Sequence, residues 1–311
     1  MRKLVTRAIH AVQLGIASSV REERARYGVL FVLPSFIFFG IFIAWPVFYS
    51  FYLGFYDWNP LDPKPVFIGL ANYRELIGSP AFLRVILNTV IFTVGDLVLV
   101  VSGSIALALA LNQRLRGTAI FRGIYYSPVV TSLVATAVIW LWILDPQYGI
   151  VNQVVRALGL PAPSWGADPV WAMPTVILTF AWREVGYFTV IYLAGLQGIP
   201  EELKEAARID GCGPWGVFRN VTFPLLMPTT FFVLVLGIIR ATQNAFAVVY
   251  VMTGGGPVDA TNVIVLYLYH YAFRFFRMGY ASAVAYVLFI FIFGLTLLQF
   301  FLLRRRMEIY R

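Results

Sequence analysis

The sequence contains little charge and very few cysteine, lysine or histidine residues. Charged residues make up 13% of its 311 positions, against about 25% in soluble domains. The single cysteine, Cys212, excludes an internal disulfide framework and a cysteine-based metal cluster. Lysine occurs only at positions 3, 64 and 204 and never follows a glycine, which excludes a P-loop for nucleotide. The two histidines, His10 and His270, are too far apart for a zinc-binding helix, so we predict no metal and no cofactor bound by this chain.

Apolar side chains take the place of the missing charge. Hydrophobic residues make up 60% of the chain, and the mean hydropathy is +0.78. Long apolar segments predict an all-α polytopic membrane protein, because helices satisfy every backbone polar group inside a bilayer. The net charge of +9 raises the question of nucleic-acid binding. The basic residues lie between apolar runs rather than on one soluble face, so no nucleic-acid partner is predicted.

Six segments reach the roughly 20 residues that a membrane-spanning helix needs. The second contains Asp96, the fourth contains Arg183 and Glu184, the fifth contains Arg240, and the others carry no charge. We therefore divide the chain into a segment at 1–27, a six-helix transmembrane domain at 28–303 and a tail at 304–311. The predicted spans cover approximately residues 28–52, 85–111, 123–144, 171–196, 225–251 and 279–303.

The distribution of lysine and arginine predicts that both termini are cytoplasmic. Sixteen basic residues lie on the side of the termini and six on the opposite side, and cytoplasmic loops carry the excess. The first apolar run is about twice as long as that of a signal peptide and lacks a clear cleavage site, so we expect a retained span. The basic residues before it fit either a helix on the inner membrane surface or a frayed tail.

One charged stretch, residues 199–223, interrupts the apolar sequence and lies on the side predicted to be cytoplasmic. Pro200 suits the first position of a helix, where its missing N–H costs nothing. Two glutamates follow, and the helix dipole favours negative charge there. Gly211 suits a left-handed residue that ends the helix, and Pro214 begins a second short helix. The stretch predicts a helix, a glycine turn and a second helix.

The first of these helices has an alanine-rich apolar face. Leu203, Ala206 and Ala207 share this face by three- and four-residue spacing. Such a small face is too weak to stabilise a fold alone, but it lets another backbone approach closely. We favour a docking surface for a partner over an ordinary amphipathic connecting loop, which stays the alternative. The charged residues occupy another face: Glu201, Lys204, Glu205 and Arg208.

The stretch carries a spaced motif. Glu205-Ala206-Ala207 is followed after three residues by Gly211, and after nine more by Val221-Thr222-Phe223-Pro224. This resembles the "EAA" loop of binding-protein-dependent ABC importer permeases, with valine and phenylalanine in place of the usual isoleucine and leucine. Other stretches resemble the carbohydrate-uptake branch of that family: "LAGLQGIPEELKEAARIDG", "LNQRLRGTAIFRGIYYSP", "WILDPQYGIVNQ", "YVMTGGGP" and "FVLPSFIFFGIFIAWPVFYSFYLGFYDW".

The resemblance implies an ABC type I importer permease fold in the cytoplasmic membrane of a bacterium or archaeon. It implies that the 199–223 loop forms a coupling helix in a cleft of an ATPase subunit, where Glu205 pairs with an ATPase arginine. The complex would contain a second permease, two ATP-binding subunits holding ATP and magnesium, and an extracytoplasmic solute-binding protein. ATP hydrolysis would lie on those subunits, so this chain is not expected to be an enzyme. By this resemblance, the residues expected to couple the permease to the ATPase are Leu203, Glu205, Ala206, Ala207, Arg208, Asp210 and Gly211.

Four charged residues lie at similar depth within the predicted spans. Charge near the bilayer midplane is costly and commonly functional. One interpretation is two or three structural ion pairs that tie spans two, four and five together. The other is that some of these side chains line a hydrated sugar cavity. Arg183 and Glu184 are neighbours in sequence, so we expect them to point in different directions. The four residues are Asp96, Arg183, Glu184 and Arg240.

Sugars are bound by aromatic rings and by hydroxyl, amide and carboxylate groups, and spans four and five offer all of these. Glu184 and Tyr187 share a helix face. By resemblance to the maltose permease, Tyr187 matches a substrate-lining tyrosine and Thr242 matches a substrate-contacting asparagine. The substrate-path candidates are Trp182, Glu184, Tyr187, Thr242, Gln243 and Asn244.

Three function classes remain to be compared. The leading hypothesis is a permease for a di- or oligosaccharide, with glycerol phosphate or a polyol as the alternative substrate. An ion-coupled secondary transporter would need internal inverted repeats, and no convincing repeat is present. An intramembrane enzyme could use Asp96 and Glu184, but no motif supports it. Small residues at Ser102, Ala106 and Ala110 predict close helix packing against a second permease.

Overall fold

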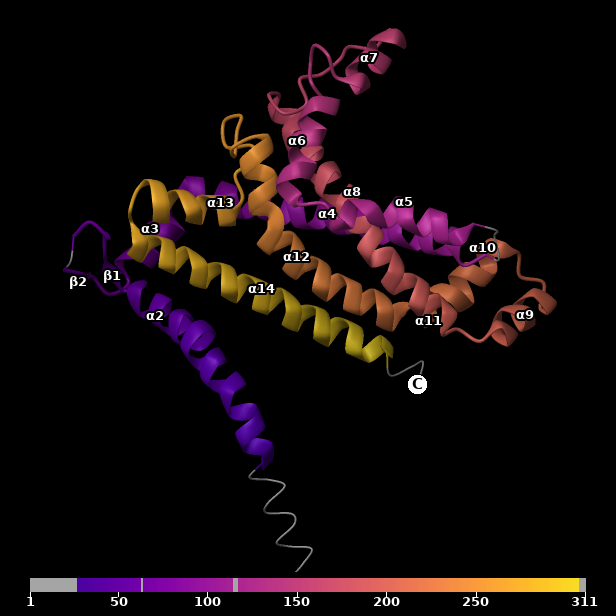
Figure 1. The fold of residues 1–311 in the computed structure, drawn as a ribbon, viewed down its shortest axis with the longest axis horizontal. Helices are drawn as coiled ribbons and strands as arrows, with labels where there is room; N and C mark the ends of the chain where they lie inside the picture. Colours follow the sequence, from indigo (N-terminus) through magenta and orange to yellow (C-terminus); the bar gives the residue numbers. More distant parts are fainter. Residues whose placement is uncertain (1–26, 63, 114–116, 308–311) are drawn as a thin grey trace, which may run out of the picture.

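The computed structural model describes residues 27–62, 64–113 and 117–307. The predicted N-terminal segment, apart from Tyr27, lies outside the described residues, and so do residues 308–311 of the predicted tail. The described chain is mostly helical and forms an elongated bundle, from which α6 (Leu133–Ile143) and α7 (Ile150–Ala157) project on one side and the first helix on the other (Figure 1).

Five helices of the described chain are long and apolar enough to cross a membrane. The first extends from Tyr27 to Leu53 and includes a π-helical turn, η1 (Gly40–Ala44), and α2 (Trp45–Leu53). These helices confirm five of the six predicted spans, with ends that shift by a few residues. The remaining four are α4 (Pro80–Leu111), α8 (Pro169–Gln197), α12 (Met227–Met252) and α14 (Met278–Met307).

The predicted third span, 123–144, is not one continuous helix. It consists of α5 (Thr118–Val130) and α6 (Leu133–Ile143), which are bent by 102° relative to each other. Ser132 caps the new helix, because its hydroxyl accepts a hydrogen bond of 3.1 Å from the backbone N–H of Ala135. The predicted third span is therefore a bent pair of helices, and α6 leaves the bundle towards α7 (Ile150–Ala157) (Figure 1).

Short elements gather at the two ends of the bundle (Figure 1). The end predicted to be external carries a two-stranded antiparallel ribbon with α3 and α13, and the end predicted to be cytoplasmic carries the 199–223 loop. The external elements are β1 (Tyr56–Asp57), β2 (Val66–Phe67), α3 (Ala71–Gly78), α13 (Ile264–Tyr269) and the π-helical η3 (His270–Arg274). The cytoplasmic elements are α9 (Glu201–Ile209), α10 (Pro214–Val217), the π-helical η2 (Phe218–Thr222) and α11 (Phe223–Leu225).

Helix α8 forms the centre of the bundle and packs along α4. It begins at Pro169 after Asp168, whose carboxylate accepts a 2.8 Å hydrogen bond from the N–H of Val170. Across the α4–α8 interface, the Ser104 hydroxyl donates to the carbonyl of Val185 at 3.0 Å. Small residues allow this approach, as membrane helices pack mainly through close backbone contact.

Helix α5 approaches α8 most closely at Gly186. A Cβ atom at this position would clash with the carbonyl oxygen of Tyr125. We expect Gly186→Ala to push the two helices apart and to cost about 1–3 kcal/mol of stability, measured as a lower unfolding temperature in detergent. The matched control is Gly123→Ala in α5, where nothing lies within 4 Å. Equal unfolding temperatures for the two variants would contradict this packing.

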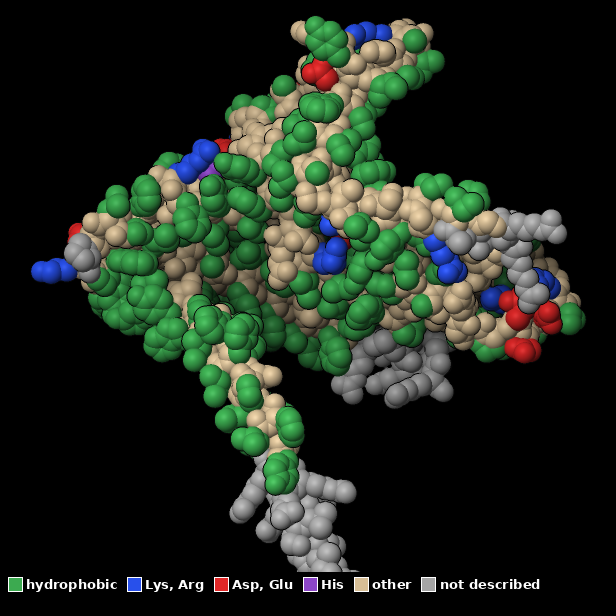
Figure 2. Space-filling model, viewed as in Figure 1, with side chains coloured by type: hydrophobic (Ala, Val, Ile, Leu, Met, Phe, Trp, Pro, Cys, Tyr) green, Lys and Arg blue, Asp and Glu red, His purple; other side chains and the backbone are tan. Residues whose placement is uncertain are grey.

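The first span diverges from the other helices (Figure 1). None of its most apolar window is buried within this chain. Its contact with the bundle is to α14, where the Tyr286 hydroxyl donates to the Val47 carbonyl at 2.5 Å. The remaining surface of this helix is hydrophobic (Figure 2) and must be covered by lipid or by another subunit.

An ion pair fixes the start of α14 to the external helix α3. Arg277 donates two hydrogen bonds of 2.6 Å to the carboxylate of Glu75, and these bonds hold the pKa of Glu75 below its usual range. The guanidinium also lies 4.8 Å from the ring centre of Tyr280. The external loop and the last span are thereby held together.

Candidate functional site

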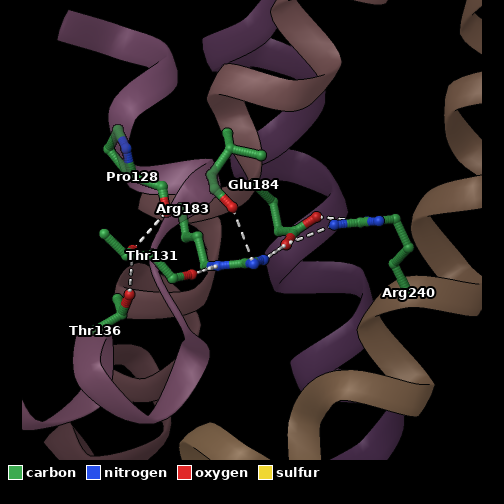
Figure 3. Close-up of polar contacts among 7 residues, drawn as sticks. Pro128, Thr131, Thr136, Arg183, Glu184 and Arg240 are labelled. Atoms are coloured by element: carbon green, nitrogen blue, oxygen red, sulfur yellow. Dashed lines mark hydrogen bonds and ion pairs between the residues drawn. The ribbon is translucent and has the colours of Figure 1, made fainter.

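Three of the four intramembrane charges form one cluster (Figure 3). Glu184 in α8 is 1% exposed and accepts hydrogen bonds from both arginines. Arg240 in α12 donates through Nε at 2.7 Å and through Nη2 at 3.1 Å. Arg183 donates through Nη1 at 2.6 Å. We name Arg183, Glu184 and Arg240 the charge cluster; it ties α8 to α12, as the ion-pair interpretation predicted.

Arg183 also occupies the break between α5 and α6. Its Nε donates to the carbonyl of Thr131 and its Nη2 to the carbonyl of Val129, both at 3.1 Å. A broken helix inside a membrane leaves backbone carbonyls that need donors, and a cation suits the C-terminal end of a helix dipole. The Thr131 hydroxyl bonds the Pro128 carbonyl at 2.6 Å and lies 3.0 Å from the Thr136 hydroxyl. The charge cluster thus links α8 both to the α5–α6 break and to α12.

The geometry corrects two expectations about these charges. Arg183 and Glu184 were expected to diverge as sequence neighbours, yet the long arginine side chain turns back and the two groups meet. Asp96 was expected to tie span two into an ion pair. It is 2% exposed and interacts electrostatically with Glu184 and Arg240, but its Oδ1 has no hydrogen-bond partner in the described part of the chain. Among the described residues span two makes no ion pair, and it is held to α8 by packing and by the Ser104–Val185 hydrogen bond.

Of the two aromatic candidates, Tyr187 lies beside the charge cluster and Trp182 packs against α6. The Arg240 guanidinium lies 4.5 Å from the ring centre of Tyr187, so Glu184 and Tyr187 meet the same partner and share a face, as predicted. Trp182 is 44% exposed, and its ring packs edge-on against Trp140 at 5.7 Å. One aromatic ring, that of Tyr187, therefore borders the charged groups.

The polar candidates of α12 are placed differently from one another. Gln243 is exposed and Asn244 is half-buried. Thr242 is 1% exposed, and its hydroxyl donates to the Ile238 carbonyl at 2.8 Å. Gln243 is therefore available to a ligand in this conformation, whereas Thr242 is not.

The 199–223 loop forms the predicted helix, turn and second helix. Helix α9 contains no buried residue. It ends at Gly211, whose φ of +86° is the left-handed conformation that favours glycine. The N–H of Cys212 bonds the Ala207 carbonyl at 2.9 Å and the N–H of Gly211 bonds the Arg208 carbonyl at 3.1 Å, which together form a Schellman cap.

The charges of α9 are unequally paired. Glu201 lies 2.8 Å from Lys204 and 3.5 Å from Arg208, and the hydrogen bond from Lys204 lowers the pKa of Glu201 most. Among the described residues, Glu205 is exposed and makes no ion pair. The predicted apolar residue Leu203 is 46% exposed, and Ile209 at the end of α9 and Trp215 in α10 are 86% and 70% exposed. A helix with an unpaired carboxylate and exposed apolar side chains is suited to contact a partner.

The described residues offer no cluster of side chains typical of a metal site. No group of three or more His, Cys, Asp or Glu side chains there could hold a metal ion. The described residues instead show a buried polar cluster within the long apolar helices and an exposed helix, α9, at the end predicted to be cytoplasmic.

Comparison with known proteins places this chain. Residues 100–308 match the family described as binding-protein-dependent transport system inner membrane component. The lactose transport system permease protein LacF of Rhizobium radiobacter is 35% identical over 303 residues, covering 94% of this chain and all of that protein. The sn-glycerol-3-phosphate transport system permease protein UgpA of Yersinia pestis is 32% identical over 283 residues, covering 90% and 94%.

A solved structure agrees with both relatives. A bacterial ABC transporter involved in the import of the acidic polysaccharide alginate contains a chain that superposes with a TM-score of 0.79 at 25% identity, covering 93% of this chain and 98% of that one. The chain therefore belongs to the binding-protein-dependent ABC transporter permeases, the multi-pass inner-membrane subunits of these systems.

Proposed function

We propose that this permease moves a neutral carbohydrate, a di- or oligosaccharide, from a solute-binding protein to the cytoplasm by alternating access. Family membership already sets aside an ion-coupled transporter and an intramembrane enzyme, and ATP hydrolysis belongs to separate subunits of such systems. The observation that carries the proposal is the exposed helix α9, which offers an unpaired Glu205 and an alanine face outside the bundle.

Helix α9 is the proposed contact with an ATPase subunit. Glu205 supplies the charge that pairs with an arginine there, and Ala206 and Ala207 let the two surfaces approach. The Schellman cap at Gly211 fixes the end of α9, so that a push on this helix reaches α10 and then α12. Leu203, Arg208 and Asp210 complete the proposed contact surface.

The charge cluster is the proposed floor of the substrate path. The Tyr187 ring borders it, and the amides of Gln243 and Asn244 follow Arg240 by three and four residues along α12. Trp182 adds an exposed aromatic side chain elsewhere on α8. Because Arg183 joins the α5–α6 break to α8, and Arg240 joins α8 to α12, these segments move together. The cluster therefore serves as a gating element as well as a polar lining.

The pairing of the two arginines favours a neutral substrate over an anionic one. Both guanidinium groups are already used, by Glu184 and by backbone carbonyls. A phosphate or carboxylate would need an arginine to leave these partners, and breaking a buried pair costs about 3–5 kcal/mol. Glycerol phosphate, the substrate in the name of UgpA, or a polyol remains the alternative.

The proposed complex contains a second permease, two ATP-binding subunits and the solute-binding protein. An apolar groove lies between α4, α12 and the α10–η2 region, and Ser102 and Ala106 line it. This groove and the uncovered first span offer apolar surface for a second permease or for lipid. Small residues in the groove agree with close helix packing.

Reconstituted transport tests the proposal. The complete importer with its solute-binding protein, in proteoliposomes loaded with ATP, is offered radiolabelled lactose, raffinose, maltotriose and glycerol 3-phosphate. We expect ATP-dependent uptake of at least one of the neutral sugars, and uptake at least about tenfold slower for glycerol 3-phosphate. Uptake of glycerol 3-phosphate alone would replace the sugar with the alternative substrate.

A further inference from the structure

Four aromatic side chains form a continuous row at the external end of α12. Phe246 and Tyr250 of α12 are stacked, with ring centres 5.3 Å apart and planes at 19°. Tyr269 at the end of α13 lies 5.0 Å from Phe246 and 5.7 Å from Tyr250. Phe273 in η3 extends the row at 5.4 Å from Tyr269. We name Phe246, Tyr250, Tyr269 and Phe273 the aromatic row.

The row continues the face of α12 that carries the charge cluster. Arg240, Gln243, Phe246 and Tyr250 follow one another at intervals of three or four residues, which places them along one side of a helix. The Arg240 side chain is 27% exposed and Gln243 is exposed. Such groups are costly in lipid and face a bundle interior or a water-filled space. The aromatic rings that extend this face therefore border the same space.

One side of the row is packed and the other is free. Phe246 and Tyr269 pack against the buried core of α8, α12 and α13. Tyr250 is 39% exposed and Phe273 is 57% exposed. In the described part of the chain the hydroxyls of Tyr250 and Tyr269 make no hydrogen bond, so both can bond a ligand. The row thus combines rings held in place by packing with tyrosine hydroxyls that are free to bond, as small-molecule sites do.

We propose that the aromatic row is a carbohydrate-binding stretch that leads a sugar from the external side to the charge cluster. This inference rests on the proposed function. The C–H faces of a pyranose ring pack against flat aromatic side chains, while its hydroxyls bond Tyr250, Tyr269 and Gln243. An elongated row accommodates more than one ring, so it suits a di- or oligosaccharide better than glycerol phosphate.

Access from the external side is the first test. Cys212 is the only cysteine of the chain, so Cys212→Ser gives a background for single cysteines at Tyr250 and Phe273 in the complete importer. We expect both to react with a charged, membrane-impermeant methanethiosulfonate reagent added outside. The control is Phe48→Cys on the first span, 70% exposed in this chain, which lipid should protect. An unreactive cysteine at position 250 would overturn the proposal, because lipid or a second permease would then cover the row.

Transport kinetics are the second test, with the panel sugar that wild type takes up. We expect Tyr250→Ala to lower the ratio of maximal uptake rate to half-saturating concentration by about two- to tenfold, and Tyr250→Trp to restore it. The control is Tyr148→Ala, since Tyr148 is 80% exposed and outside the row. Co-purification of the ATPase should not change in any variant. A role in subunit packing would instead lower co-purification, which would overturn the proposal.

The two proposals fail in different ways. If wild type takes up none of the panel sugars, the proposed function fails and the aromatic row fails with it. If wild type takes up a sugar and Tyr250→Ala matches Tyr148→Ala, only the inference about the row fails.

Discussion

Reversing one charge, with Glu205→Lys, is expected to abolish ATP-driven uptake while the permease still folds in the membrane. Glu205 is exposed and has no ion-pair partner among the described residues of its own chain, so the substitution breaks nothing internal. At the proposed contact it would place a lysine against an arginine of the ATPase. Removing one partner of a buried pair costs about 3–5 kcal/mol, which corresponds to a loss of affinity of roughly 100-fold or more.

The measurement is co-purification of the ATPase subunit with the tagged permease, followed by uptake in proteoliposomes. Glu202→Lys provides the matched control, because it makes the same charge change on an exposed residue of the same helix. We expect Glu202→Lys to retain the ATPase and most of the uptake. Undiminished transport by the Glu205→Lys variant would rule out the coupling role of α9.

Sequence alone predicted α9 and the long spans because their signals are local. Pro200, two glutamates and Gly211 are enough to place a helix and its end, and the structure confirms that Gly211 takes a left-handed φ. Hydropathy likewise finds the five continuous spans, since length and apolar content decide whether a helix can cross a bilayer. Neither signal depends on how distant parts of the chain pack.

The break in the third span could not be predicted in this way. Residues 123–144 carry no charge, and a proline such as Pro128 is tolerated within membrane helices. The break is stable because Arg183, from another helix, donates to the carbonyls of Val129 and Thr131. The Thr131-Ser132 pair was a signal, because serine and threonine favour the start of a new helix.

The charge cluster was predicted in part, for a related reason. Spacing places Glu184 and Tyr187 on one face, and the structure confirms this through their common partner, Arg240. Which charges pair depends on the register between α4, α8 and α12, and that register is set by packing at sites such as Gly95 and Gly103 of α4. The ion-pair interpretation therefore included Asp96, which forms no ion pair among the described residues.

Removing the carboxylate at the centre of the charge cluster is expected to destabilise the permease strongly. Glu184→Gln keeps the shape of the side chain but leaves Arg183 and Arg240 without their counter-charge inside the membrane. Loss of one partner from a buried pair costs about 3–5 kcal/mol, a large share of the about 5–15 kcal/mol that stabilises a typical protein. We expect a lower unfolding temperature in detergent and less protein in the membrane.

A second substitution separates the ion pair from a general effect on packing. Combining Glu184→Gln with Arg240→Met removes both charges of the α8–α12 link, and a buried ion pair replaced by neutral groups is often no less stable. Arg183 keeps its two carbonyl partners in this variant, so the α5–α6 break stays satisfied. The double variant should therefore recover most of the lost stability, although the path would lose its polar floor and uptake would stay low. If it is as unstable as Glu184→Gln alone, the carboxylate does not act by neutralising Arg240, and the linked movement of α8 and α12 loses its basis.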